Sequence, residues 1–339
     1  MAKRGSSGLS LIVAINKPAG MSSHDVVNQC RSIFNERRVG HMGTLDPLAS
    51  GVLPICVGPA TRLNAYLTNH DKTYRMAIEF GIATSTDDRE GNIISSSAVP
   101  DSLFDPDKAR KTLDSLIGSG MQIPPAYSAI KVNGQKAYEQ ARQGNIIELA
   151  PRPFSVYDVV FEEVRTVVNR EGITVPQWIA TFHVSKGTYM RSIARDLGHA
   201  LQTVAHVASL ERCAVGNLGL DDCVTLEQLK DNPLGHSIDP LRLLTMRWAF
   251  VRDVREKVEH GASLDHNDIS LNLPLENDMF SAECCTSSVF PSKTPPQDGE
   301  VVALVVDRKV KALYEYCQDK QRYKARCVFA IGVERGTGL

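Results

Sequence analysis

The stretch from Gly40 to Pro54 constrains the fold more than any other part of the chain, because it sets one carboxylate among small, apolar and ring-constrained residues. Pro47 disfavours helical backbone at Asp46 and pushes that residue towards an extended conformation. The three glycines of the stretch permit backbone conformations or close approaches that a side chain would obstruct. The pattern predicts a loop held in one shape that presents Asp46.

Asp46 has two interpretations when only its neighbours are considered. The apolar side chains of Leu45, Pro47 and Leu48 would remove water from the carboxylate, which then stays ionised only beside a cation or hydrogen-bond donors. This interpretation predicts a partner cation elsewhere in the chain. Alternatively, Asp46 caps the next turn, which is a common role for aspartate. The spacing alone favours neither.

Length and charge limit the class of protein. The chain has 339 residues, of which 42% are hydrophobic and 23% are charged, so we expect a globular protein of about two domains. Its formal net charge is -1 at pH 7. Overall charge therefore does not indicate a nucleic-acid partner, and any RNA-binding surface must be a local patch.

Cysteine usage predicts reduced thiols and no metal site. The eight cysteines are scattered without a CxxC pair, and Cys284 and Cys285 are too close for ordinary metal-ligand spacing. Nothing resembles a secretory signal, and the apolar run Leu9 to Ile15 is too short to span a bilayer. We therefore expect a cytoplasmic protein.

Hydrophobic periodicity predicts alternating helices and strands. In the strand Lys72 to Phe80, every second residue is apolar, which places Tyr74 at the edge of an apolar face. A helix is expected from Thr188, a plausible cap, with Arg191 and Arg195 on one face. Taken alone, Arg191 would be a surface residue, whereas Tyr74 and Leu210 would belong to the core. Further helices and strands are expected at Ser22–Phe34, Val52–Val57, Pro106–Ile117, Phe154–Phe161, Trp178–Val184, Val204–Val215, 251–259, 301–306, 311–316 and 323–331.

Several motifs, in this order along roughly the first two-thirds of the chain, resemble the TruB family of tRNA pseudouridine-55 synthases. The long pattern around Asp46 is the most specific of them. The motifs are Asn16–Ser23, Gly40–Pro54, Asp71–Arg75, Pro124–Gly144, Ser185–Arg195 and Leu210–Gly216.

The resemblance implies an α+β pseudouridine synthase fold with a mixed, mostly antiparallel sheet. It implies a catalytic domain over residues 1–245 with an inserted thumb at about 124–152. Lys131, Lys136, Arg142 and Arg152 would give the thumb a positive surface. Residues 246–339 would form a small, mainly β C-terminal domain that resembles a PUA-like RNA-binding module.

The resemblance also assigns roles to individual residues. Asp46 would be the catalytic carboxylate and Arg191 its cation, while Tyr74 would pack on the target base and help to move its proton. The other implied substrate-binding residues are His41, which would support a flipped-out base, Tyr189 beside that base, Leu210 against the uracil, and Lys17.

The implied activity is isomerisation of uridine to pseudouridine at position 55 in the T loop of tRNA. It needs no cofactor, and we expect the tRNA T arm as the partner, no membrane association, no obligatory protein partner and a monomer. Three routes stay open for Asp46: attack on C1', attack on C6, or assistance to a glycal. Two rival functions are a nucleoside-bond hydrolase, although most glycosidases use paired carboxylates, and a noncatalytic tRNA-binding or tRNA-folding protein.

Overall fold

The computed structural model describes residues 7–336 except Thr68, Ala129 and residues 133–134, 137–139, 141–148 and 276–290. The chain divides into two compact units. The first unit comprises Met1–Asp46, Gly51–Asn69 and Gly216–Leu339, and the second comprises Pro47–Ser50 and His70–Val215. This division differs from the predicted domain boundary at residue 245, which stays a prediction. Each unit is described by itself.

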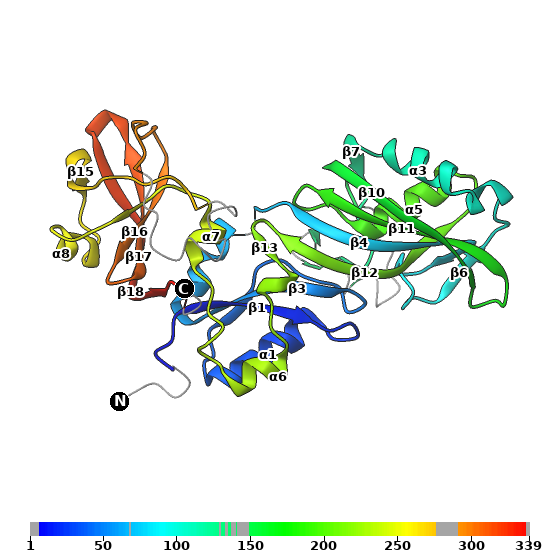
Figure 1. Cartoon of the computed structure of the whole chain (residues 1–339), viewed down its shortest axis with the longest axis horizontal. Helices are drawn as coiled ribbons and strands as arrows, with labels where there is room; N and C mark the ends of the chain where they lie inside the picture. The colour runs from blue at the N-terminus through cyan, green and yellow to red at the C-terminus, as the bar shows by residue number, and fades with distance from the viewer. Residues whose placement is uncertain are drawn as a thin grey trace. The chain divides into compact units, whose positions relative to one another are not determined.

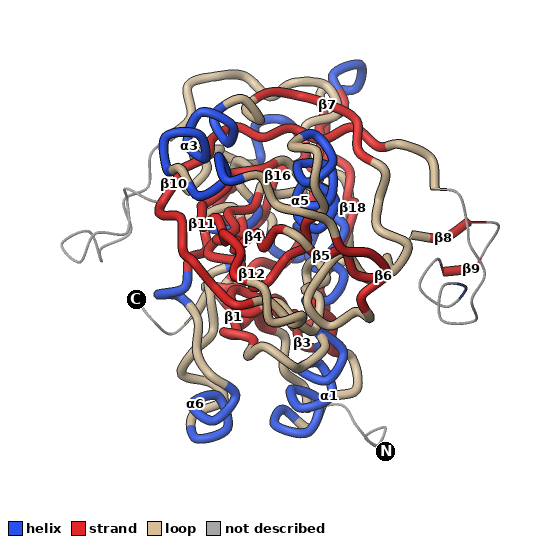
Figure 2. The backbone as a smooth tube through the Cα atoms, turned by 90° about the vertical axis from the view of Figure 1, so that its right-hand side faces the viewer, coloured by secondary structure: helices blue, strands red, loops and turns tan. Residues whose placement is uncertain are grey.

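The second unit is built on antiparallel strands in the order β12-β4-β11-β10-β7, which Figure 2 shows side by side. Two short pairs, β5 with β6 and β8 with β9, accompany them. The strands are β4 Lys72–Phe80, β5 Ile82–Thr84, β6 Ile93–Ser96, β7 Gly118–Gln122, β8 Lys131–Val132, β9 Gln135–Lys136, β10 Arg152–Val168, β11 Thr174–Val184 and β12 Ala205–Val215.

The alternation predicted for β4 is confirmed. Tyr74, Met76, Ile78 and Phe80 are buried, whereas Thr73, Arg75 and Glu79 on the other face are only partly covered. Ala77, also on that other face, is the exception, because it is buried in a small cluster with Ile179 and Ala208. The ring of Phe80 packs edge-on against Trp178 of β11, with ring centroids 4.8 Å apart. One face of this sheet is therefore core.

Among the described residues, two α-helices and the short 3-10 helix η2, Asp101–Phe104, contact the sheet of the second unit (Figure 1). Helix α3, Pro106–Asp114, contacts β10, and helix α5, Met190–Ala200, contacts β12. Helix α3 ends three residues before the predicted Ile117, and Gly118 then adopts a φ of +135° at the start of β7. Helix α5 carries the arginines that the sequence placed on one face.

The N-terminal part of the first unit is a small sheet with helices. Strand β1, Leu11–Lys17, and strand β2, Val39–His41, both pair antiparallel with β3, Ser50–Val57. Helix α1, Ser23–Phe34, begins with a capping box in which Ser22 and Asp25 bond reciprocally. The further elements are η1 Gly58–Leu63, α2 Asn64–Leu67, β13 Leu218–Gly219, η3 Leu220–Asp222, α6 Leu226–Asp231 and α7 Pro240–Leu244.

The C-terminal part of the same unit is a five-stranded sheet in the order β14-β16-β17-β18-β15. Strand β14 pairs parallel with β16, and the other pairs are antiparallel, so the sheet is mixed. Three strands were predicted here, and the structure adds two short ones. The elements are β14 Trp248–Phe250, α8 Arg255–Glu259, β15 Leu264–Asp265, η4 His266–Asp268, β16 Val301–Val306, β17 Lys309–Cys317, η6 Gln318–Lys320 and β18 Arg322–Glu334.

The last strand of the chain is bonded to the first residues of the same unit. The backbone N–H of Glu334 donates to the carbonyl of Ser10 at 2.9 Å. Arg62 donates to the carbonyl of Val328 at 2.7 Å and lies over the ring of Phe329. Strand β18 is therefore bonded directly to the residue before β1 and to the segment that follows β3.

An ion pair joins the residue that follows β18 to the N-cap residue of α7. Both Nε and Nη2 of Arg335 donate to Oδ2 of Asp239, at 2.8 and 2.6 Å, and Asp239 also caps α7. The guanidinium lies 5.1 Å from the ring centroid of Trp248. Because only 3% of the Asp239 side chain is exposed, its charge depends on this partner.

We expect Arg335→Ala to lower the free energy of unfolding by roughly 3 kcal/mol, because it leaves the buried Asp239 carboxylate without its cation. The matched control is Arg322→Ala, whose pair with Asp265 is more than half exposed on both sides. That change should alter stability by less than about 1 kcal/mol. Urea unfolding monitored by circular dichroism measures both, and equal effects would contradict the account.

Among the described residues, no helix is both long and apolar enough to cross a membrane. Within the same part of the chain, no group of three or more His, Cys, Asp or Glu side chains is arranged to hold a metal ion. Cys30 and Cys56 are free thiols whose burial raises their pKa to about 12. They are therefore neutral and behave as small apolar core residues.

Candidate active site

The loop that carries Asp46 is pinned on both sides. The N–H of Met42 donates to the carbonyl of Pro54 at 2.9 Å, and Gly43 has a φ of +90°, which favours glycine. The hydroxyl of Ser23 accepts from the N–H of Leu45 at 2.8 Å and donates to its carbonyl at 2.9 Å. The backbone just before Asp46 is thus fixed from α1, which agrees with the predicted held loop.

Ser23 is a residue whose part in the site the sequence did not reveal. The pair Ser22–Ser23 predicted a helix cap, and only Ser22 performs that role. Ser23 is buried, and its hydroxyl bonds both polar groups of Leu45. No local pattern distinguishes these two adjacent serines, because the contact joins positions 22 residues apart.

Three residues predicted for the site lie in the first unit. Asp46 is partly buried between the buried Leu45 and the exposed Pro47. His41 is the last residue of β2, opposite Ile55 of β3, and is partly buried. Lys17 is fully buried at the end of β1, where its amino group donates to the carbonyls of Pro18 and Met21. These bonds give Lys17 a structural role, and its predicted contact with substrate stays a prediction.

Tyr74 and Leu210 share one face of the second unit's sheet. Leu210 of β12 lies opposite Met76 of β4, and Arg212 lies opposite Tyr74. Because directly opposed residues point to the same side and faces alternate along a strand, all four side chains lie on one face. Tyr74 and Leu210 are 8% and 7% exposed, so each shows only an edge to solvent.

Tyr189 is the N-cap residue of α5. Its side chain makes no capping bond, and its N–H instead donates to Oε1 of Gln122 at 2.6 Å. The predicted cap at Thr188 is wrong, because the Thr188 hydroxyl lies 3.1 Å from that of Ser185 within the preceding turn. Gln122, at the end of β7, therefore helps to fix where α5 begins.

Arg191 is buried, so the surface position suggested by its local sequence alone is wrong. Only 5% of the residue is exposed, although it lies in the first turn of α5. Its Nη1 donates to the carbonyl of Thr86 and its Nη2 to that of Tyr127, both at 3.0 Å. Nη1 also lies 3.8 Å from Oδ2 of Asp88. The guanidinium is thus held in one orientation from two segments.

Asp88 is a second residue that sequence reasoning missed. It is 4% exposed, and its Oδ1 accepts from the hydroxyl of Thr86 at 2.5 Å and from the N–H of Glu90 at 3.0 Å. Its other oxygen faces Arg191. By sequence alone, the acidic turn of residues 87–92 indicates only a structural turn that RNA would avoid, whereas a buried arginine nearby requires such a carboxylate.

The neighbouring Asp87 holds the next arginine of α5. Arg195 Nη1 donates to Oδ2 of Asp87 at 3.1 Å, and its Nη2 donates to the carbonyl of Ile123 at 2.8 Å. Burial raises the pKa of Asp87, and the nearby Arg195 and Arg191 oppose that effect. Ser192 also donates to the carbonyl of Ile123, at 2.8 Å. Helix α5 is therefore tied both to the acidic turn and to the segment that follows β7.

Most of the predicted thumb lies outside the described residues. Arg142 is not described, and no side-chain position is given for Lys131 or Lys136. Arg152 is exposed at the start of β10, and Tyr127 is partly buried before the insertion. The positive thumb surface stays a prediction.

The second unit thus combines an aromatic ring, an apolar contact and fixed positive charge. A sheet face with Tyr74 and Leu210 can receive a flat heterocycle, because aromatic side chains stack on bases. The buried Arg191 can stabilise an anion in addition to the carbonyls it binds, because a guanidinium has five donors. These are features of a site for a nucleobase and a carboxylate.

Two family models match consecutive parts of the chain. Residues 31–190 match the TruB family pseudouridylate synthase N-terminal domain, and residues 191–242 match the tRNA pseudouridylate synthase B C-terminal domain. A protein of Pediococcus pentosaceus named tRNA pseudouridine synthase B is 35% identical over 92% of this chain and 96% of its own length. A Bacillus subtilis protein of the same name is 40% identical over 75% of this chain and 83% of its own.

Solved structures support the fold. A chain of the Cbf5-Nop10-Gar1 complex covers 97% of this chain and 87% of its own, with a TM-score of 0.65 and 22% identity. The predicted architecture of α and β elements, with a mixed sheet and a small β region at the C-terminal end, is confirmed. With the family models and the named relatives, it follows that this chain belongs to the TruB family of pseudouridine synthases, which are isomerases.

Proposed function

We propose that this protein converts the uridine at position 55 in the T loop of tRNA to pseudouridine. The name shared by its relatives supports tRNA as the substrate. The single observation that carries the proposal is the burial of Arg191 with its guanidinium fixed by two carbonyls. A buried, oriented arginine in a pseudouridine synthase is suited to hold a carboxylate through two hydrogen bonds.

The reaction makes specific demands on the protein. The bond between ribose C1' and uracil N1 breaks, the base turns, and C1' bonds to C5, while the C5 proton leaves and N1 gains a proton. No electrons are gained or lost overall, so the isomerisation itself requires no redox cofactor. It requires an ionised carboxylate, retention of the detached base and a proton acceptor for C5.

Asp46 is the proposed carboxylate, and Arg191 is the cation that keeps it ionised. The motif around Asp46 and the pinning of its loop through Ser23 support the assignment. A guanidinium can hold a carboxylate through two parallel hydrogen bonds, which fixes its orientation as well as its charge. Attack on C1', attack on C6 and assistance to a glycal all use the same ionised oxygen.

Tyr74, Tyr189 and Leu210 are the proposed contacts of the uracil. The shared sheet face of Tyr74 and Leu210 supports this, since it offers a ring and an aliphatic side chain to one flat ligand. Tyr74 would also help to move the C5 proton. Tyr189 precedes Arg191 on α5, so the base and the cation would be held by the same turn.

The target uridine must leave its stack to reach these residues. Extrusion costs roughly a few kcal/mol, which stacking on Tyr74 and pocket contacts would offset. His41, partly buried in β2, is proposed to support the extruded conformation. Lys17 is a further proposed substrate contact, although its amino group already donates to two carbonyls.

An isolated T-arm hairpin tritiated at uracil C5 tests the proposal against its two rivals. We expect tritium release with the uracil retained in the RNA, and no release when the target uridine is replaced by cytidine. Free uracil in the supernatant would instead identify a nucleoside-bond hydrolase. Tight binding of the hairpin with all tritium retained would identify a noncatalytic RNA-binding protein.

A further inference from the structure

Three basic side chains gather at one end of the second unit's sheet, on the side of Tyr74. Lys72 opens β4, and both Lys72 and Tyr74 lie on the same face because they are two residues apart. Arg212 of β12 lies opposite Tyr74, and Val184 of β11 lies opposite Lys72. Lys186 follows Val184 by two residues. We call Lys72, Lys186 and Arg212 the cation cluster.

The members of the cation cluster differ in exposure. Arg212 is 1% exposed, Lys72 is partly buried, and Lys186 is exposed. Diagonal neighbours on adjacent strands have Cα atoms about 7–8 Å apart, which long side chains span easily. The cluster therefore leads from the buried face beside Tyr74 out to solvent, where an extended anion could follow it.

The charges of the cluster act on one another. Burial, and after it the positive charge of Arg212, lowers the pKa of Lys72 to about 8, and Lys186 adds to this effect. Asp71 acts in the opposite direction, and its Oδ1 also lies 3.4 Å from the hydroxyl of Tyr157. The amino group of Lys72 donates to the carbonyl of His70. Like charges crowded in a partly desolvated place favour the arrival of an anion.

We propose that the cation cluster binds a phosphodiester of the RNA that flanks the target uridine. This rests on the proposed function, since a uracil on Tyr74 carries its own backbone phosphates with it. Lysine is a strong, adaptable point-charge partner for phosphate, and contact with phosphate fixes the register of a nucleic acid without reading its sequence. The cluster thus holds the nucleotide's backbone while Tyr74 and Leu210 hold its base.

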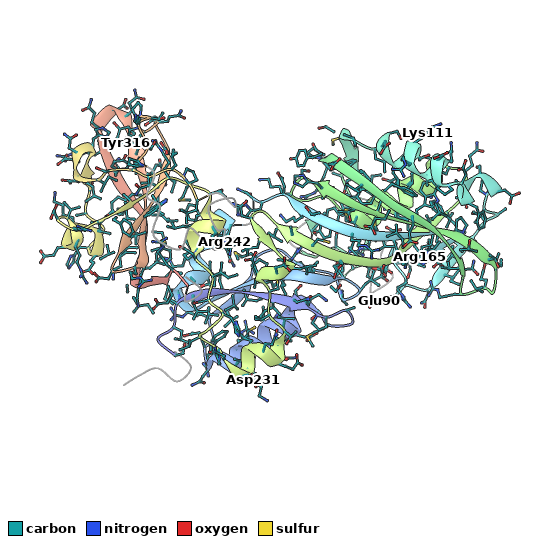
Figure 3. The ribbon with its side chains drawn as sticks, in the orientation of Figure 1. Glu90, Lys111, Arg165, Asp231, Arg242 and Tyr316 are labelled. Carbon is teal, nitrogen blue, oxygen red and sulfur yellow. The ribbon has the colours of Figure 1, made fainter. Side chains whose placement is uncertain are left out.

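A double-mutant cycle between protein and RNA tests the proposal. The ligands are T-arm hairpins with pseudouridine already at the target position, so that turnover cannot change them during a binding measurement. In two of them one methylphosphonate, which is neutral, replaces the phosphate on the 5' or the 3' side of the target. Lys72→Met and Lys186→Met remove the charges on the protein side. Lys111→Met, on the exposed face of α3 (Figure 3), is the control.

With wild-type protein, one of the two methylphosphonates should weaken binding roughly fivefold. Lys72→Met and Lys186→Met should each weaken binding of the hairpin without methylphosphonate by a similar factor and reduce the salt slope of binding by about one. Each variant should also abolish the effect of that methylphosphonate. Lys111→Met should leave all three quantities unchanged. Because Lys186 is exposed, its variant should fold even if loss of Lys72 perturbs β4.

The proposal would be overturned if, for both lysines and both methylphosphonates, the losses of binding free energy simply added. The methylphosphonate would then weaken binding equally in the wild type and in the lysine variants. A methylphosphonate effect that Lys111→Met removes as well would also overturn the proposal. If instead wild-type protein fails to bind the hairpin without methylphosphonate at all, the proposed function itself has failed. The two failures are therefore distinguishable in the same set of titrations.

Discussion

Asp46→Asn should bind tRNA as tightly as the wild type and form no measurable pseudouridine. Asparagine keeps the shape of the side chain within its pinned loop and removes the negative charge that all three routes require. We expect the single-turnover rate to fall by at least roughly a thousandfold, the scale seen when a reacting side chain is removed. Tritium release from C5-labelled tRNA, measured at saturating enzyme, separates this loss from any change in binding.

The control for Asp46→Asn is Asp158→Asn, an exposed aspartate on β10. The single-turnover rate of this control should equal that of the wild type, because losing one negative charge far from the reaction should not slow it. Substantial tritium release by Asp46→Asn would remove Asp46 from the chemistry. Loss of tRNA binding in parallel would show that Asp46 mainly shapes the binding surface.

Arg191→Lys should reduce the single-turnover rate by roughly a hundredfold, although the charge is kept. A guanidinium can bond Thr86, Tyr127 and a carboxylate in one plane, whereas a flexible ammonium with three donors cannot reproduce that geometry. Single-turnover tritium release at saturating enzyme measures this loss.

Arg191→Met should be more severely affected than Arg191→Lys, since it leaves Asp88 buried without its cation. The matched control is Arg165→Lys on β10 (Figure 3), whose pair with Glu163 is about half exposed. Single-turnover rates measure the whole set. An Arg191→Lys enzyme with the wild-type rate would show that Arg191 only ties α5 to its neighbours.

Local patterns in the sequence predicted much of the secondary structure. The alternation from Lys72 to Phe80 matches β4 except at Ala77, which is buried although it lies on the more open face of the strand. The helix expected at Ser22–Phe34 is α1, which begins after the cap at Ser22 and ends at Phe34. Such signals depend only on residues a few positions apart, which is why they can be read without the fold.

The features that the sequence did not reveal depend on contacts between distant residues. Arg191 is buried because Thr86 and Tyr127, more than sixty positions away, supply carbonyls to it. Asp88 faces it from a turn that by itself only indicated a structural loop. The motif resemblance gave Arg191 its role, whereas its supports became visible only in the folded unit.

Contacts of the C-terminal strands with distant residues were likewise not visible in the sequence. Pro233, Gly235 and Pro240 interrupt the local pattern shortly before the predicted domain boundary at residue 245, which stays a prediction. Within the first unit, however, Arg335 bonds Asp239 across that point, and Glu334 bonds Ser10 at the other end of the chain. An interruption of the local sequence pattern does not indicate which segments pair in the folded protein.

Pseudouridine can be mapped at single-nucleotide resolution in an unmodified full-length tRNA after a single turnover, which shows directly whether Asp46 is needed to modify position 55. Carbodiimide treatment followed by primer extension gives one stop for each pseudouridine. We expect one stop, at position 55, with wild-type protein, and none with Asp46→Asn. A stop at another uridine, or the same stop with both proteins, would contradict this expectation.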